Sequence, residues 1–442
     1  KDSHMRDTWA IFSKTPLRKK EKKAMGKKRT EKAITVVHQV CCGLDVHKKV
    51  ISACLLISDK HGNEYADVQE FETFTDSLIE LRKWLLKNKC PVVALESTGI
   101  YWRPIHNILE DHVQVVLVNP RHVKNLPGHK TDIEDSRWLA SLLKHGLVKG
   151  SFIPPKEIRR WRDHTRLRVK HVQTTASYKQ RTQKLLESAN IKIDSVLSDL
   201  FGVSGRRLLK LLAQGNKPSL EDINQVVHGS VKGKSYELFR SIQGYFTEHH
   251  ALLLRTNLET IEFHERQVAL LDECLETMMA HIEPLIQELD KIPGIDKVAA
   301  RAILAEIGIS LDDFKSSGHL SAWAGLCPGN NESAGKRKTG RSPVKKHVLK
   351  TVLVEVAWAA IKKKDSFFKE KYYRLKSRTT PKKAIVAIAH KILKVVYHIV
   401  KHGVEYQELG ADYLHRQNEK ATLRRLEKQA ANLGLKLVPI EA

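Results

Sequence analysis

The sequence predicts an α/β domain followed by all-helical regions, and three observations support this class. Between residues 36 and 118 the apolar residues gather in short, β-branched runs, each about as long as a single strand. From residue 158 to residue 289 apolar residues recur at helical spacing among many charges. The last third of the chain is also helical in pattern and is strongly basic. At 442 residues the chain can hold two or three domains, each with its own core.

The α/β domain can be predicted element by element. Two apolar runs, Val36–Val46 and Val50–Ile57, are expected to be strands separated by a polar turn. A further turn at Asp59–Asn63 leads to a third strand, Ala66–Phe74. The remaining elements are a helix containing Leu78–Leu86, a strand at Pro91–Leu95, a helix at Tyr101–Leu109, a strand at Val113–Val118 and a helix at Asp132–Lys144. Three antiparallel strands followed by β-α-β-α is the order of a ribonuclease H-like fold.

Changes in composition divide the chain into five parts. They are a basic arm (1–35), an α/β domain (36–155), a helical coiled-coil segment (156–290), a helical domain (291–408) and a C-terminal helical tail (409–442). The arm carries twelve basic and four acidic side chains in its first 33 residues, which is typical of a solvated segment. Residues Lys1–His4, ahead of Met5, resemble a cloning remnant rather than part of the fold.

An apolar seam runs through the end of the coiled-coil segment. Its residues alternate spacings of three and four: Val268, Leu271, Leu275, Met278, Ile282, Leu285 and Leu289. Such a seam can pack on helices of its own domain or on a second chain, and the spacing does not decide between the two. Pro284 interrupts the seam, so the helix there must kink or a new helix must begin.

The charge of the chain indicates a polyanionic partner. Lysine and arginine number 76 against 50 acidic residues, a formal net charge of +26, and nucleic acid is the commonest polyanion in a cell. The imbalance is sharpest at 336–401, where twenty basic residues face three acidic ones. No apolar run approaches the eighteen or so residues of a membrane span, and no secretory signal is apparent. The six scattered cysteines have no metal-binding spacing, so we expect reduced thiols in a cytoplasmic, nucleoid-associated protein.

Four carboxylates are candidates for one metal site. Asp45 and Glu96 each end an apolar strand, and in a ribonuclease H-like sheet those two strands are neighbours. Asp132 and Asp135 are three residues apart on a predicted helix, so both face the same way while Glu134 points elsewhere. Clustered carboxylates repel one another unless cations bind, and hard oxygen ligands favour Mg²⁺ or Mn²⁺. Two such ions can support phosphoryl transfer.

Five motifs resemble the DEDD transposases of the insertion sequence 110 family. In chain order they are GLDVHK (43–48), ESTGIY (96–101), KTDIED (130–135), IPGI (292–295) and LSAWAGL (320–326). The resemblance spans about residues 38 to 405. The chain departs from the family in its long basic arm and at Ser136, where family members more often carry alanine.

The resemblance implies a RuvC-like domain, a coiled-coil segment and a C-terminal transposase domain. It further implies a homo-oligomer, a dimer or tetramer, that inserts or excises its element by recombining donor and target DNA. In the family a structured RNA from the element, a bridge RNA, selects these DNA sites. The guide RNA rests on the resemblance alone. From the residues themselves, Ile292–Ile295 has the pattern of a helix-hairpin-helix turn, whose amides and following helix N-terminus can hold a DNA phosphate.

Ser333 is the candidate nucleophile. It lies in a polar loop, Leu326–Lys338, ahead of Gly335 and a basic cluster, and the family places its nucleophilic serine in this loop. The residues expected to contact nucleic acid there are Lys336, Arg337, Lys338, Arg341, Lys345 and Lys346. No histidine is close in sequence to act as base, so activation is expected from metal ions held by the carboxylates, with the two domains closing on one DNA. Ser342 and Ser321 are less favoured, because the first precedes Pro343 and the second lies in a predicted helix.

Two other functions fit part of the sequence. A Holliday-junction resolvase would use the same four carboxylates with water as nucleophile, but it leaves the helical segment and the basic last third without a role. An architectural nucleic-acid-binding protein with an inactive site would explain the charge alone. We rank the recombinase first, the resolvase second and the binding protein third.

Overall fold

The computed structural model describes residues 36–59, 63–97, 99–119, 132–215, 217–329, 331–333, 336–339 and 347–438. For residues 132–134, 331–333, 336–339, 415, 417, 418, 420 and 421 it describes the backbone but not the side chains. The basic arm therefore lies outside the described residues, as do Arg341, Ser342, Lys345 and Lys346. The chain separates into two compact units that divide between Ile153 and Pro154.

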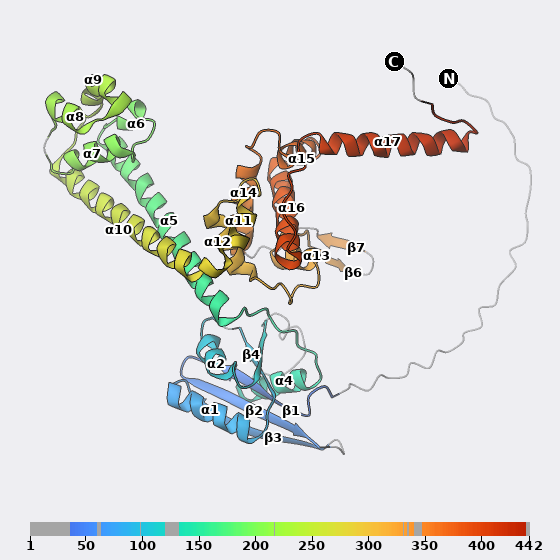
Figure 1. Cartoon of the computed structure of the whole chain (residues 1–442). Helices are drawn as coiled ribbons and strands as arrows, with labels where there is room; N and C mark the ends of the chain where they lie inside the picture. The colour runs from blue at the N-terminus through green and yellow to red at the C-terminus, as the bar shows by residue number, and fades with distance from the viewer. Residues whose placement is uncertain are drawn as a thin grey trace, which may run out of the picture. The chain divides into compact units, whose positions relative to one another are not determined.

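The first unit is a five-stranded mixed sheet with helices on both faces (Figure 1). Its elements are β1 (Val40–Val46), β2 (Val50–Ser58), β3 (Glu64–Glu72), α1 (Thr75–Lys87), β4 (Val92–Glu96), α2 (Trp102–Leu109), β5 (Gln114–Val118) and α4 (Asp132–Lys144). The strand order is β3-β2-β1-β4-β5, in which the first three strands are antiparallel and β1, β4 and β5 are parallel. This order confirms the predicted ribonuclease H-like arrangement.

Two cores flank the sheet because successive strand residues point to opposite faces. Leu44 and Leu95 belong to the core beneath α1 and α2. Cys41 and Ala94 belong to the core beneath α4, together with Leu139 and Leu143 of that helix. Burial on both faces explains why β1 and β4 read as continuous apolar runs rather than alternating ones.

The second unit begins with a long antiparallel helical hairpin, α5 (Lys156–Ser188) and α10 (Glu248–Met278), visible in Figure 1. Its tip is a small helical bundle with its own core, built from α6 (Ile193–Val196), α7 (Val203–Leu212), α8 (Leu220–Val226), η1 (Gly229–Lys234) and α9 (Ser235–Ser241). Ion pairs join the two long helices. Arg168 donates to both carboxylate oxygens of Asp272, and Lys179 pairs with Glu265 at 3.1 Å.

Four residues of the predicted apolar seam are buried within their own chain. Leu275 is 2% exposed, and Leu271, Ile282 and Leu289 are also buried. The helix ends at Met278, and after the short η2 (Ala280–Ile282) a new helix, α11 (Glu283–Asp290), begins with Pro284 in its first turn. Of the two alternatives predicted for Pro284, a kink or the start of a new helix, the structure shows the second. Of the two partners considered for the seam, the structure places these four residues against their own unit.

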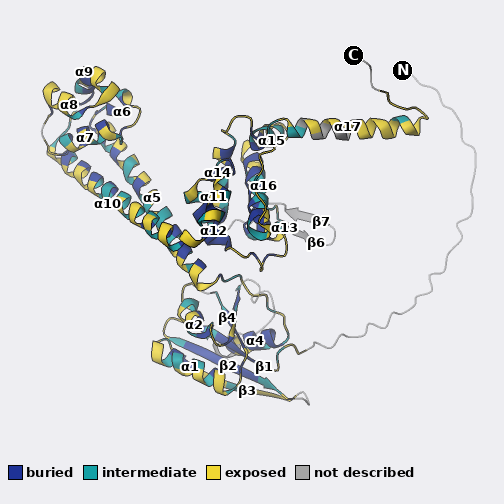
Figure 2. Cartoon of the chain, viewed as in Figure 1, coloured by how far each residue is buried: buried dark blue, intermediate teal, exposed yellow. Residues whose placement is uncertain are grey.

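The rest of the second unit is a helical domain around α16 (Pro381–His402). The other elements are α12 (Lys297–Ile307), α13 (Ser317–Trp323), β6 (Asn331–Ser333), β7 (Lys336–Thr339), α14 (Val348–Ala360), α15 (Phe367–Lys376) and α17 (Tyr413–Asn432). A buried carboxylate, Glu306 of α12, accepts two hydrogen bonds from Arg166 of α5 and ties the hairpin to this domain. Helix α17 is exposed along much of its length (Figure 2). Within the described ranges, no helix is long and apolar enough to span a membrane.

Candidate active site and nucleic-acid interface

The parallel pairing of β1 with β4 brings Asp45 beside Glu96. The register pairs Leu44 with Leu95, so the two carboxylates are the next residues along neighbouring strands. Residues side by side on neighbouring strands point to the same face of the sheet. Leu44 and Leu95 point to the face of α1 and α2, so Asp45 and Glu96 point to the opposite face, where α4 lies. The sequence prediction that these two carboxylates meet therefore agrees with the register.

Helix α4 is held against this face by a contact next to Asp45. Ser52 is the antiparallel partner of Asp45 on β2, and its hydroxyl lies 3.3 Å from the hydroxyl of Ser136 on α4. Both serines are buried. Since opposed residues of an antiparallel pair share a face, this hydrogen bond places the first turns of α4 over the strand that carries Asp45.

Gly43 permits this close packing. A Cβ atom at Gly43 would lie 2.1 Å from the carbonyl oxygen of Ser136 and 2.5 Å from the amide nitrogen of Ala140, both main-chain atoms of α4. Contacts that short do not occur, so any larger residue would push the helix away from β1. The glycine two residues before Asp45 thus sets how near α4 comes to the carboxylates.

Asp135 is exposed and immediately precedes Ser136 on α4, and Asp132 is the first residue of that helix. The side chain of Asp132 lies outside the described part of the chain. Among the described side chains, no group of three histidine, cysteine, aspartate or glutamate residues is arranged to hold a metal ion. The four-carboxylate site therefore remains a prediction, for which the structure supplies the adjacency of Asp45 to Glu96 and the position of α4.

His47 is a residue near the site to which the sequence analysis gave no role. Its Nε2 atom lies 3.0 Å from Oδ2 of Asp45, whose side chain is 19% exposed. The two residues are two positions apart at the end of a strand. Because alternate residues of a strand share a face, this spacing could have indicated that His47 lies beside Asp45. His47 can orient the Asp45 carboxylate.

Ser333 lies at the end of a hairpin strand rather than in an irregular loop, which corrects the sequence expectation. It ends β6, and its partner on the antiparallel strand β7 is Lys336. The pairing continues with Glu332 opposite Arg337. The backbone register thus places Ser333 next to the first residues of the basic cluster. The side chains of both strands lie outside the described part of the chain. The fallback residue Ser321 is buried in α13 and donates a hydrogen bond to the carbonyl of Ser317 at 2.7 Å.

The turn at Ile292–Ile295 joins α11 to α12 as the helix-hairpin-helix pattern predicts, but its surroundings disfavour a phosphate. Gly294 has a φ of +85°, and a Cβ there would lie 2.4 Å from the carbonyl oxygen of Val356. Asp296 caps α12 by accepting a hydrogen bond from the amide of Ala299 at 2.7 Å. This end of the helix already holds a carboxylate of its own chain.

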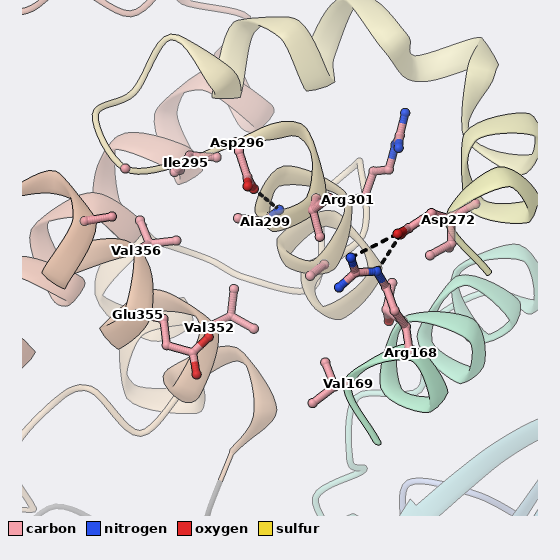
Figure 3. Close-up of a pocket in the computed structure, with 16 residues that line it drawn as sticks. Arg168, Val169, Asp272, Ile295, Asp296, Ala299, Arg301, Val352, Glu355 and Val356 are labelled. Atoms are coloured by element: carbon pink, nitrogen blue, oxygen red, sulfur yellow. Dashed lines mark hydrogen bonds and ion pairs between the residues drawn. The ribbon is translucent and has the colours of Figure 1, made fainter. Parts of the chain in front are cut away.

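A pocket of about 500 Å³ lies beside this turn, between α5, α10, α12 and α14 (Figure 3). Its walls are mostly apolar, and Figure 3 shows that Arg168 is directed to Asp272 while Asp296 is directed to Ala299. Both arginines in the wall have carboxylate partners, because Arg301 also pairs with Glu276 at 3.3 Å. The wall therefore offers no arginine without a carboxylate partner, which disfavours binding of a nucleic-acid backbone there.

Two family models match the chain. One describes the DEDD-type transposases of the IS110 group and matches residues 42–191. The other is described as the transposase IS116/IS110/IS902 family and matches residues 286–373. A comparison with curated proteins gives no match.

Solved structures similar to part of the chain include RuvC of Thermus thermophilus, at 13% identity and a TM-score of 0.21. They also include a Fowlpox virus resolvase in complex with Holliday junction DNA, at 14% identity and a TM-score of 0.20. Each match covers 25% of this chain and 99% of the other chain. Similarity at this level is too weak to support a conclusion about activity.

Proposed function

Because the chain belongs to the IS110 family of transposases, we propose that it cuts and rejoins DNA to insert and excise a mobile element. The carboxylates Asp45, Glu96, Asp132 and Asp135 form the proposed catalytic site. The observation that carries the assignment is the β1–β4 register, which sets Asp45 beside Glu96 on the face that α4 covers. The family membership makes the chain a nucleic-acid-cleaving enzyme; the residues and the metal are the proposal.

Divalent Mg²⁺ or Mn²⁺ fits the donors that these elements provide. Carboxylate oxygens are hard ligands. Asp45 and Glu96 lie at the ends of adjacent strands, at the margin of a buried core. Bound there, the metal would help to activate an attacking oxygen and to stabilise a leaving one. The role of the protein's own residues is to hold the carboxylates in place. The buried Ser52–Ser136 bond and the Gly43 contact fix α4, and His47 orients Asp45.

Ser333 is the proposed nucleophile. Its hydroxyl oxygen forms a bond to the scissile phosphorus while the bond from phosphorus to the leaving strand oxygen breaks, and the hydroxyl proton passes to the leaving oxygen or to water. The product is a phosphoserine–DNA intermediate that conserves the bond for rejoining. Support comes from the β6–β7 register, which keeps Ser333 beside Lys336. Guidance by a bridge RNA and assembly as a dimer or tetramer complete the proposal and rest on the family.

The test of the metal site combines cleavage with direct metal binding. Asp45→Asn and Glu96→Gln keep side-chain shape and remove one negative charge each, so both are expected to abolish cleavage of element-end DNA and to weaken Mn²⁺ uptake in calorimetry. His47→Gln serves as the matched neighbour, for which reduced but measurable cleavage is expected. Wild-type Mn²⁺ binding in both carboxylate variants would refute the site.

A separate test concerns the nucleophile. Wild-type protein trapped on labelled DNA should yield an adduct that survives denaturation and maps to Ser333, and Ser333→Ala should yield none. Cleavage by wild-type protein without any adduct would favour a resolvase that uses water. An adduct that persists in Ser333→Ala would refute Ser333.

A further inference from the structure

The last turns of α16 carry two histidines four residues apart, His398 and His402. Residues four apart on a helix lie on the same face, with Cβ atoms about 5–6 Å from each other. The two imidazole rings stack at an interplanar angle of 25°, and their centroids are 5.5 Å apart. Both residues are exposed. An ion in solution can therefore reach both rings.

The nitrogen atoms of this pair are available to a ligand. Within the described ranges, neither imidazole forms a hydrogen bond or an ion pair, and their ring contacts are with each other and with Tyr397. The ring centroid of Tyr397 lies 5.5 Å from that of His398 and 6.1 Å from that of His402. The Tyr397 hydroxyl donates to the carbonyl of Phe314 at 3.2 Å, which fixes the tyrosine in the core. Tyr397 thus supports both rings without engaging their nitrogens.

The spacing of the two rings suits chelation of one metal ion. Metal–nitrogen bonds are about 2.0–2.1 Å long, so two nitrogens bound to one ion are at most about 4 Å apart. Rings whose centroids are 5.5 Å apart can reach that separation by rotation of their side chains, without a change in the helix. Two histidines at i and i+4 on one helix face are also the zinc ligands of the H-E-x-x-H motif.

The charges around the pair act in opposite directions. Lys394 precedes His398 by four residues on the same helix face and repels a cation. Glu405 lines the same cavity of about 280 Å³ as His398 and attracts one. The charge of Lys401 is offset by Asp312, whose Oδ1 lies 2.5 Å from the lysine Nζ. The pair also lies at the C-terminal end of α16, where the last carbonyl groups carry negative partial charge.

We propose that His398 and His402 bind a divalent transition-metal ion that favours nitrogen ligands, such as Ni²⁺, Cu²⁺ or Zn²⁺. Among the described side chains, no third histidine, cysteine, aspartate or glutamate is arranged to join them, so water completes the coordination. The bound ion links two successive turns at the end of α16, where the chain continues toward α17. The site does not depend on the proposed function, because Asp45 and Glu96 belong to the other unit and are hard ligands that favour Mg²⁺.

The first test measures Ni²⁺ binding by calorimetry, with excess Mg²⁺ present to occupy the carboxylates. His398→Ala and His402→Ala should each weaken the tightest Ni²⁺ binding by at least about 10-fold, because even groups behind the direct ligands of a metal contribute that much. The matched control is His228→Ala, which removes an exposed histidine with no other histidine within four residues. The control should keep the wild-type affinity. Wild-type affinity in both His398→Ala and His402→Ala, or an equal loss in the control, would overturn the site.

The second test reads the histidines directly. Diethyl pyrocarbonate modifies accessible imidazole nitrogens, and mass spectrometry of peptides locates the modified residues. Ni²⁺ should protect His398 and His402 in the wild-type protein, while His228 reacts equally with and without Ni²⁺. In His402→Ala, the same Ni²⁺ concentration should no longer protect His398. Unprotected histidines in the wild type would overturn the site without any substitution, and protection of His398 that persists in His402→Ala would overturn chelation by the pair.

Discussion

The hydroxyl groups of Ser52 and Ser136 lie 3.3 Å apart, although the two residues are 84 positions apart in the sequence. Ser52 is the cross-strand partner of Asp45, and Ser136 follows Asp135. The bond therefore links β2, the strand paired with the one that carries Asp45, to the helix that carries Asp132 and Asp135.

Gly43→Ala should destabilise the α/β unit and displace α4. The added Cβ would meet the main chain of Ser136 and Ala140, and overpacking of this kind costs about 1–3 kcal/mol. Urea denaturation measures the loss, and cleavage should fall with it because α4 carries Asp132 and Asp135. Gly233→Ala is the control, since nothing lies within 4 Å of its Cβ position. Equal stability of the two variants would contradict the packing argument.

Asp135→Ala should lower the cleavage rate by at least about 10- to 100-fold, because even residues behind the direct ligands of a metal site contribute that much. Folding should be unaffected, since Asp135 is exposed. The neighbouring Glu134→Ala removes the same charge and should stay active. Single-turnover cleavage with both proteins decides the matter, and normal cleavage by Asp135→Ala would remove this residue from the site.

Leu275→Ala should destabilise the helical hairpin without changing the molar mass of the protein. Leu275 is 2% exposed inside its own unit, and deleting such a side chain costs about 2–5 kcal/mol. Leu270, on the same helix, is 52% exposed, and Leu270→Ala should cost less than about 0.5 kcal/mol. Thermal unfolding and light scattering measure the two properties. A lower mass with intact folding would show instead that the seam joins two chains.

Raising the pH above 9 should destabilise the α/β unit through its buried thiols. Burial raises the pKa of Cys90 to about 11 and that of Cys41 to about 12, so both stay protonated in the folded state where the unfolded chain ionises. Their stabilising contribution is complete below pH 9 and is lost between pH 9 and 11 or 12. The urea midpoint of wild type should therefore fall more between pH 8 and pH 10.5 than that of Cys90→Ala. Parallel pH profiles would exclude a contribution from this thiol.

The α/β domain and the adjacency of Asp45 and Glu96 could be predicted from the sequence. Strand residues alternate with a period of two, and parallel strands β1 and β4 end at one edge, so Asp45 and Glu96 could be placed together from their positions after apolar runs. Pro284 likewise predicted a break in the seam, because a proline inside a helix removes a backbone hydrogen bond and destabilises the helix.

What each apolar pattern packs against is visible only in the folded structure. Periodicity reports which side chains of Leu271–Leu289 are buried but not whether the partner is the same chain, and the structure supplies α5 and the unit's own core. Two further contacts could not be predicted from the sequence. They are the strand pairing of Ser333 with Lys336 and the approach of Lys371 and Lys391 to the ring of Phe367. These contacts depend on distances between segments that have no fixed spacing along the chain, so only the folded arrangement specifies them.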